Sequence, residues 1–269
     1  MINSRSVLAF ALVVAARGLC LDAQTLSGVD VRFSAQEKTL CLGEPVAIEF
    51  RATNRSLSSA TIDLGFDREE AFVFDIAEPD GSWSRVKAPQ RDREGISRVG
   101  RFSLGQGESY TQKIRLGVWY SFSKTGTYVI TGNLVPAIDG DPAARTFTIT
   151  ITELDPAHLR ATCERLAARA LDPAGSGSFD AAVDLGLVKD PVSVPYLEKV
   201  VRAQKPAVRI AAIWALGRIA TLEATEVLLS VMNGANDEDR SRSYVLLLSI
   251  ARTTQNREVR ERLAGAGIH

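Results

Sequence analysis

The pattern of apolar and polar positions changes once along the chain, near residue 155. Before that point, short runs alternate apolar and polar side chains, and the clearest run follows the turn residues Leu42–Pro45. Alternation with a period of two is typical of a strand with one buried face. Turn residues also separate later runs, at Pro79–Gly81 and Gly105–Gly107. The pattern predicts strands over Val46–Ala52, Ala60–Leu64, Phe72–Ala77, Ile114–Leu116, Thr127–Leu134 and Thr146–Thr152.

This series of short strands predicts an antiparallel β-sandwich over residues 24–154. The segments Gly43–Phe50, Pro79–Gly81 and Gly126–Ile130 resemble those of bacterial extracellular immunoglobulin-like domains, close in pattern to the proteinase-inhibitor type. The resemblance implies that the hydroxyl of Tyr128 binds backbone a few residues upstream, as the corner tyrosine of that fold does.

After Asp155 the apolar positions follow a helical period. Asp155 is a favourable N-cap and Pro156 suits the first helical position. The segment Asp172–Ser178, rich in Gly, Ser and Pro, is expected to end this helix. The residues of the apolar stripe are Leu159, Cys163, Leu166, Ala167, Ala170 and Leu171.

An internal repeat follows. Leu185-Gly186 returns as Leu216-Gly217, 31 residues later, and loosely as Leu248-Ser249, 32 residues after that. A repeat of this length with helical patterning predicts stacked helix pairs, each covering an apolar face of its neighbour. Other pairs in this register are Leu197 with Leu228 and Arg209 with Arg240.

The segments Val194–Leu197 and Val208–Ile219 resemble the two helices of the short bacterial HEAT repeat. The resemblance covers residues 180–235 and weakens beyond, with Arg257–Leu263 as a half-repeat. It implies an all-α HEAT-type solenoid over residues 155–269 whose small residues let the helices of a pair approach closely. Lys205 stands where the family often has an aspartate, which weakens the expectation of a side-chain ladder along the array. The fold class is therefore multidomain, an all-β immunoglobulin-like sandwich followed by an all-α HEAT-type solenoid.

The N-terminus has the features of a secretory signal. Arg5 precedes an apolar run of ten residues, Val7–Ala16, whereas a membrane-spanning helix needs about 20. We expect residues 1–23 to form a signal peptide cleaved after Ala23, or alternatively after Ala16, and the mature protein to be periplasmic or secreted without a membrane span. Lipidation of Cys20 stays open as an alternative.

Charge and composition exclude some functions. The chain has 32 basic and 32 acidic side chains, so its net charge gives no electrostatic reason to bind nucleic acid or an anionic membrane. Its two histidines and three cysteines leave little material for acid–base or metal chemistry. After signal removal, Cys41 and Cys163 remain, either as a disulfide or, as we favour, as two buried apolar residues in different domains.

Candidate catalytic groups do not form a recognisable motif. His269 is the last residue, and His158 lies five residues before Cys163, which places the two side chains about 140° apart on a helix. The chain has neither C-x-x-C nor H-E-x-x-H. Of its carboxylate clusters, Glu69-Glu70 is typical of a solvated turn and Asp237–Asp239 of charge at a helix N-terminus, which the helix dipole favours. Asp139–Asp141 looks only superficially like a calcium loop. We predict no catalytic, cofactor or metal site.

Aromatic residues are the remaining candidates for partner contact. Trp83 follows a turn, whereas Trp119 and Tyr120 either contact a partner or, as we favour, fill the end of the sandwich core. Trp214 is expected in the core between repeats. The predicted function is non-catalytic binding of a protein or peptide through the helical surface. The alternatives are proteinase inhibition through the loop Ala88–Gly95 and an enzyme with an unrecognised carboxylate site.

Overall fold

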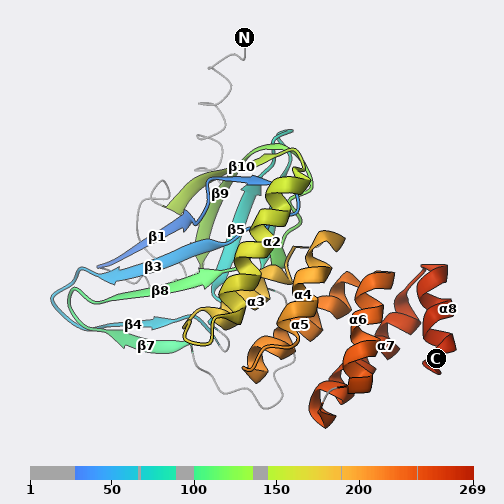
Figure 1. Cartoon of the computed structure of the whole chain (residues 1–269). Coiled ribbons are helices and arrows are strands. Elements are labelled where there is room, and N and C mark those ends of the chain that lie inside the picture. The colour runs from blue at the N-terminus through green and yellow to red at the C-terminus, as the bar shows by residue number, and fades with distance from the viewer. Residues whose placement is uncertain (1–27, 66–67, 89–99, 136–144, 189, 235) are drawn as a thin grey trace.

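The computed structural model describes residues 28–65, 68–88, 100–135, 145–188, 190–234 and 236–269. Strands occupy the N-terminal part, and the helices follow one another away from it toward the C-terminus (Figure 1). The predicted signal peptide with Cys20, the segment Asp139–Asp141 and all of the loop Ala88–Gly95 except Ala88 lie outside the described residues.

The described strands form three sheets. The first has the order β1-β3-β8, the second β2-β10-β9-β5-β6, and the third β4-β7. Neighbouring strands are antiparallel except β2 and β10, which are parallel. Their bounds are β1 Val29–Ala35, β2 Thr39–Cys41, β3 Ile48–Asn54, β4 Ala60–Asp63, β5 Phe72–Ala77, β6 Trp83–Lys87, β7 Arg101–Leu104, β8 Ser109–Ile114, β9 Gly126–Leu134 and β10 Thr146–Thr152.

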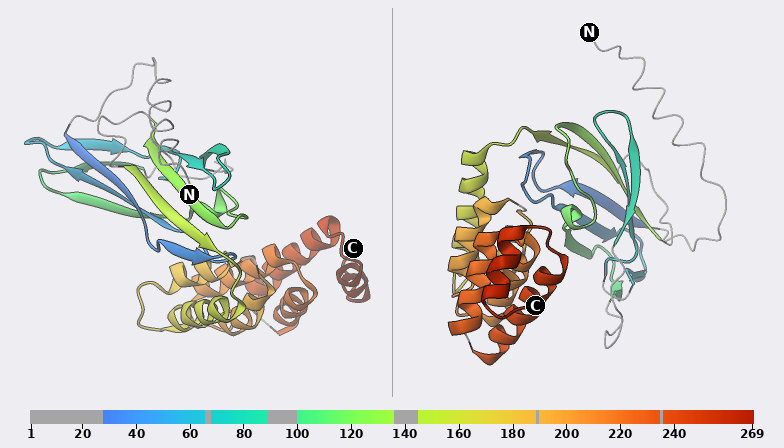
Figure 2. Two further views of the ribbon diagram at one scale, coloured as in Figure 1. Left: turned by 90° about the horizontal axis from the view of Figure 1, so that it is seen from above. Right: turned by 90° about the vertical axis from the view of Figure 1, so that its right-hand side faces the viewer.

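The first two sheets share one apolar core. Phe33 and Phe50 come from the three-stranded sheet, and the ring of Phe50 lies edge-on to Phe72 of the five-stranded sheet with 4.9 Å between centroids. Gly132 leaves room for these rings, because a Cβ there would lie 2.5 Å from the ring of Phe33. The two sheets therefore face each other across a layer of phenylalanine rings (Figure 2).

Tyr128 belongs to this core and binds upstream backbone, as the resemblance implied. Its side chain is fully buried on β9, and its hydroxyl donates to the carbonyl of Lys124 at 3.0 Å. The same hydroxyl accepts from the amide of Lys124 at 3.1 Å. Because Lys124 lies four residues upstream, the prediction that Tyr128 binds upstream backbone is confirmed.

Two of the predicted strands, Phe72–Ala77 and Thr146–Thr152, have the predicted bounds. The prediction for Ile114–Leu116 is wrong, because β8 ends at Ile114 and a short 3-10 helix, η1, spans Leu116–Val118. Most of β8 is polar and none of its residues before Ile114 is fully buried, so the apolar pattern marked only its end. Strands β1, β2, β6 and β7 were not predicted. Strand β6 has no fully buried residue, which leaves no apolar signal.

The helices begin directly after the last strand. The carboxylate of Asp155 accepts from the amides of Ala157 and His158 at 2.9 and 3.0 Å, which confirms the predicted N-cap. The helix bounds are α2 Pro156–Leu171, α3 Ser178–Leu185, α4 Val194–Val200, α5 Pro206–Ile219, α6 Leu222–Gly234, α7 Asp237–Thr253 and α8 Arg257–Gly265, with a 3-10 turn, η3, at Pro191–Ser193.

Burial fixes the register of the repeat at 31 residues. Leu185, Leu216 and Leu247 are fully buried at equivalent positions of α3, α5 and α7. The third unit therefore aligns through Leu247, and the predicted Leu248 is one residue late. Equivalent positions of the alternate helices α2, α4, α6 and α8 are Leu166, Leu197, Leu228 and Val259, all buried. We call α2, α4, α6 and α8 the first helices of the repeats and α3, α5 and α7 the second helices, so that α8 is a half-repeat.

Glycines let successive second helices approach closely. A Cβ on Gly186 would lie 2.5 Å from that of Ala215, and one on Gly217 would lie 2.8 Å from Leu246. The sequence placed Ala215 and Gly217 between the two helices of one pair, whereas the structure places both of them between neighbouring repeats. They hold the stack together along its length.

Polar side chains also connect neighbouring repeats. The guanidinium of Arg209 donates to the buried carboxylate of Asp239 at 2.9 Å, from α5 to the start of α7. In the other direction, the ammonium of Lys205 donates to the carbonyl of Gly175 at 2.9 Å, in the loop before α3. Helix α5 and the residue before it are thus joined by polar contacts to the repeats on both sides, through Arg209 and Lys205.

The β-region covers the open end of the helical stack. Asp184 of α3 is equivalent to Ala215 and Leu246, each of which packs on the preceding repeat. Among the described residues, α2 and α3 form the first pair of the stack, so α3 has no preceding repeat to pack on. Asp184 instead accepts hydrogen bonds from Lys113 at 2.5 Å and from Arg115 at 2.8 Å. An end repeat needs a cap for its exposed face. Strand β8 and the residue after it supply this cap.

Candidate functional site

Exposed apolar side chains collect on one face of the second helices. Trp214 of α5 is 47% exposed and Val245 of α7 is 58% exposed, and Phe179 of α3 is also exposed. Val183, Trp214 and Val245 are equivalent in the 31-residue register. Phe179 and Ile210 are equivalent to each other in the same register. They lie four residues before Val183 and Trp214, respectively, and therefore on the same side of their helices. We call the surface of the exposed Phe179, Trp214, Tyr244 and Val245, together with the half-buried Val183 and Ile210, the second-helix face.

The position of Trp214 corrects the sequence prediction. We expected this side chain in the core between repeats, but about half of it is exposed. Helix α5 is apolar around most of its circumference, with Ala211, Ile213 and Ala215 buried on the other sides. Periodicity therefore could not show which apolar residue faces solvent.

A shallow cavity of about 520 Å³ adjoins the second-helix face at α6 and α7. Tyr244 and Ser241 line it from α7, and Met232 lines it from α6. Arg240 stands at its rim and donates to Asp237 and to the carbonyl of Met232. The cavity thus combines an aromatic ring, a thioether and a charged group, a mixture typical of peptide-binding surfaces.

The aromatic candidates of the β-region lie in two settings. Trp83 stands on β6 and is 64% exposed. Trp119 packs against Phe74 with 5.5 Å between ring centroids, and the hydroxyl of Tyr120 donates to Glu78. Both Trp119 and Tyr120 are packed against the β-core, in agreement with the structural role that we favoured. Contact of any of the three with a partner stays a prediction.

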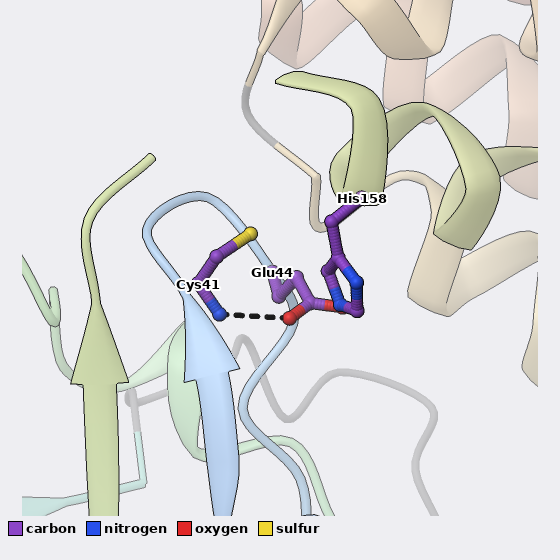
Figure 3. Close-up of side chains that lie close together, drawn as sticks. All are labelled: Cys41, Glu44 and His158. Carbon is purple, nitrogen blue, oxygen red and sulfur yellow. Dashed lines mark hydrogen bonds and ion pairs between the residues drawn. The ribbon is translucent and has the colours of Figure 1, made fainter. Parts of the chain in front are cut away.

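A second polar cluster lies where the β-region meets α2 (Figure 3). The carboxylate of Glu44, from the turn after β2, is only 6% exposed. It accepts from the amide of Cys41 and from the hydroxyl of Thr162, both at 2.8 Å. The Nε2 atom of His158, on the first turn of α2, lies 3.2 Å from the same carboxylate. One donor atom each of Cys41, Glu44 and His158 lie within 4.8 Å of one another.

No motif in the sequence indicated this cluster, because Cys41 and Glu44 are more than a hundred residues from His158. Their meeting depends on how α2 packs on the turn after β2. Leu159 of α2 fixes this packing, since it lies 3.2 Å from the Cβ position of Gly43, whose φ of +93° favours glycine.

The two cysteines share one apolar cluster. Cys41 lies on β2 but packs with the buried residues of the helical region, among them Leu159 and Cys163. Cys41 belongs to the β-region and Cys163 to α2, as expected, but the two side chains lie in the same apolar cluster. Both are free thiols, and burial raises the pKa of Cys41 and raises the pKa of Cys163 to about 12. Both side chains are buried, as in the interpretation that we favoured, and a disulfide between them stays the alternative.

The carboxylates Asp237–Asp239 lie in the first turn of α7, as expected of charges that the helix dipole favours. Asp239 is in addition buried and bound to Arg209. In the part of the chain that the structure describes, no helix combines the length and the apolar character required to cross a membrane.

Comparison with known proteins identifies the helical region. Residues 164–249 match the family model of HEAT repeats. This is the region in which burial repeats every 31 residues, so the helical solenoid and its HEAT repeats are confirmed. No curated protein matches the chain.

Solved structures share only remote similarity with the chain. A β-glucosidase from Listeria innocua is 12% identical with a TM-score of 0.28, and the match covers 46% of this chain and 16% of that enzyme. The sporulation control protein Spo0M from Bacillus subtilis is 13% identical with a TM-score of 0.28, over 52% of this chain and 56% of that one. The CARDB domain of a Pyrococcus furiosus protein is 10% identical with a TM-score of 0.27, over 47% of this chain and 94% of that domain.

Proposed function

We propose that this chain is an exported, non-catalytic binding protein in which an immunoglobulin-like β-sandwich caps a HEAT-type solenoid. The partner is a protein or peptide, and it binds to the second-helix face. HEAT repeats generally mediate protein–protein interaction, and residues 164–249 match them.

The observation that carries the proposal is the exposure of Trp214 and Val245 at equivalent positions of the neighbouring second helices α5 and α7. A repeat protein conserves its internal contacts from unit to unit, and an apolar residue that recurs at an exposed position contributes nothing to those contacts. Exposed tryptophan and tyrosine side chains contribute most of the binding energy at many protein interfaces. A row of such side chains across several helices is therefore suited to an extended or helical peptide.

Features of the β-region support the immunoglobulin-like fold and export. Two sheets share a core, and Tyr128 binds the backbone of Lys124 as the corner tyrosine of that fold does. Arg5 and the apolar run Val7–Ala16 support export. N-terminal sequencing of the protein recovered from outside the cytoplasm tests this part, and a start at Gln24 is expected.

The binding proposal is tested by selecting ligands from a displayed random-peptide library on the full chain. Isolated peptides are then titrated against wild type, Trp214→Ala and Val245→Asp. We expect affinity to fall at least about tenfold in each variant, because an interface hot spot contributes about 2 kcal/mol or more.

The matched control is Leu57→Asp, since Leu57 is an exposed apolar residue far from the helices in the β3–β4 turn. This variant should bind with unchanged affinity. Peptides that bind all four proteins equally would refute the second-helix face as the recognition surface. Inhibition of a protease panel by the wild-type chain would favour the sandwich loops instead.

A further inference from the structure

Cys41, Glu44 and His158 have the chemistry of a transition-metal site. Thiolate, imidazole and carboxylate are the three ligand types that Zn²⁺ takes in proteins, with metal–ligand distances of about 2.0–2.3 Å. Around a tetrahedral ion, these distances place the ligand atoms about 3.3–3.8 Å apart. The three donor atoms already lie within 4.8 Å, and the His158 Nε2 to Glu44 distance is 3.2 Å. Figure 3 shows the three side chains converging between the turn after β2 and the first turn of α2.

The two faces of the cluster differ in exposure. Cys41 and the carboxylate of Glu44 are buried, whereas the side chain of His158 is 56% exposed. An ion therefore has access from the His158 side, and this exposed imidazole has the freedom to rotate onto it. Three protein ligands leave the fourth position of a tetrahedral ion for a water molecule.

Neighbouring groups orient the buried ligands. Thr162 donates its hydroxyl and Cys41 donates its amide to the carboxylate of Glu44. Such outer contacts hold metal ligands in position in known sites, and their removal lowers metal affinity about 10–100-fold.

Charge provides the second argument. The buried carboxylate of Glu44 is bound by two neutral donors, and among the residues that the structure describes its ion-pair partner is the exposed His158. A buried carboxylate is costly without a compensating cation. With the thiolate of Cys41, the ligand set carries two negative charges, which a divalent ion neutralises.

We propose that Cys41, Glu44 and His158 bind one Zn²⁺ ion that joins the β-region to α2. Binding replaces the proton of the Cys41 thiol with the metal, and that proton passes to solvent, so affinity increases with pH. The ion is coordinated by residues of both regions and therefore stabilises the capped arrangement. The site does not depend on the proposed recognition of a peptide.

The test uses the reduced full chain and two ions. Co²⁺ replaces Zn²⁺ and reports a thiolate ligand through its sulfur-to-metal charge-transfer absorption, and Zn²⁺ affinity is measured by competition with a chromophoric chelator. We expect one ion per chain and an increase in melting temperature with Zn²⁺. Cys41→Ser should abolish the charge-transfer band, and His158→Ala should weaken Zn²⁺ binding at least about tenfold.

The chain supplies matched controls for both ligands. Cys163→Ala and His269→Ala remove the other described cysteine and the other histidine, and Cys20→Ser removes the third cysteine. All three should bind as wild type does. Circular dichroism of each variant establishes that it is folded, and His158→Ala is the decisive variant because its exposed side chain contributes little to the core.

Three results would overturn the proposal. The first is equal Zn²⁺ affinity in wild type and folded His158→Ala, and the second is a charge-transfer band that persists in Cys41→Ser. The third is a Cys41–Cys163 disulfide whose reduction yields no Co²⁺ band. Loss of peptide binding in the variants of the second-helix face has no effect on any of these readouts.

Discussion

Replacement of Asp184 by alanine tests whether the β-region caps the helical stack. Its carboxylate has only 9% of its surface exposed and accepts from Lys113 and Arg115, whose side chains are 25% and 20% exposed. Removing one partner of a fully buried ion pair costs about 3–5 kcal/mol. Because the two cations keep some contact with water, we expect Asp184→Ala to lower the free energy of unfolding by about 2–3 kcal/mol.

The assay is urea unfolding followed by far-ultraviolet circular dichroism, which reports mainly the helices. The control is Glu198→Ala, which removes an exposed pair with Arg202 on α4 and should cost less than about 0.5 kcal/mol. A double-mutant cycle of Asp184→Ala with Arg115→Met should give a coupling energy of about 1–2 kcal/mol. A cost for Asp184→Ala no larger than that of Glu198→Ala, or a coupling energy near zero, would refute the capping role.

Three further predictions concern the β-region and one helix end. Tyr128→Phe should lower the free energy of unfolding by about 1–2 kcal/mol, since it removes two hydrogen bonds to the backbone of Lys124, and denaturant titration measures this. Gly132→Ala should cost more than about 2 kcal/mol because its Cβ clashes with a buried phenylalanine ring, whereas Gly234→Ala has open space and should be neutral or stabilising by up to about 1 kcal/mol in the same titration. The hydrogen bond from Lys124 lowers the pKa of Glu78, so this pairing stabilises the fold above the ordinary pKa of a glutamate and is lost as the pH falls through the lowered value. Melting temperatures measured against pH should therefore decline more gently on the acid side in Lys124→Met than in wild type.

A specific result would contradict each of these predictions. Tyr244→Phe, at an exposed ring, is the control for Tyr128→Phe, and equal costs would show that the corner hydrogen bonds contribute nothing. If alanine at Gly132 and at Gly234 changed the free energy of unfolding equally, the two sheets would have to move apart at little cost to make room for the Cβ beside Phe33. Parallel acid limbs in wild type and Lys124→Met would exclude the pairing with Glu78.

Much of the local structure could be predicted because single residues determine it. Asp155 and Pro156 fixed the start of α2, and the apolar run Phe72–Ala77 fixed a strand with both bounds. The repeat was visible in Leu185 and Leu216 because each unit must bury the same position. Its third member was assigned one residue late, since Leu246–Leu248 are three consecutive leucines and only burial distinguishes them.

The contacts between the two regions could not be predicted. Asp184 looks like an ordinary charged residue of a helix, and its burial depends on Lys113 and Arg115 lying beside it. In the same way, Cys41 and His158 come together only because α2 packs on the turn after β2. Such contacts arise between segments far apart in sequence, where no period or motif connects them.

The most direct test of the central claim is site-specific photocrosslinking on the second-helix face. A photoreactive amino acid replaces Val245 in one protein and Leu57 in another, both of which are exposed positions. Both proteins are irradiated with the same selected peptide ligand, and the products are identified by mass spectrometry. The account predicts crosslinked peptide at position 245 and none at position 57. Crosslinking at position 57 with none at 245 would show that recognition takes place on the β-region and would contradict the account.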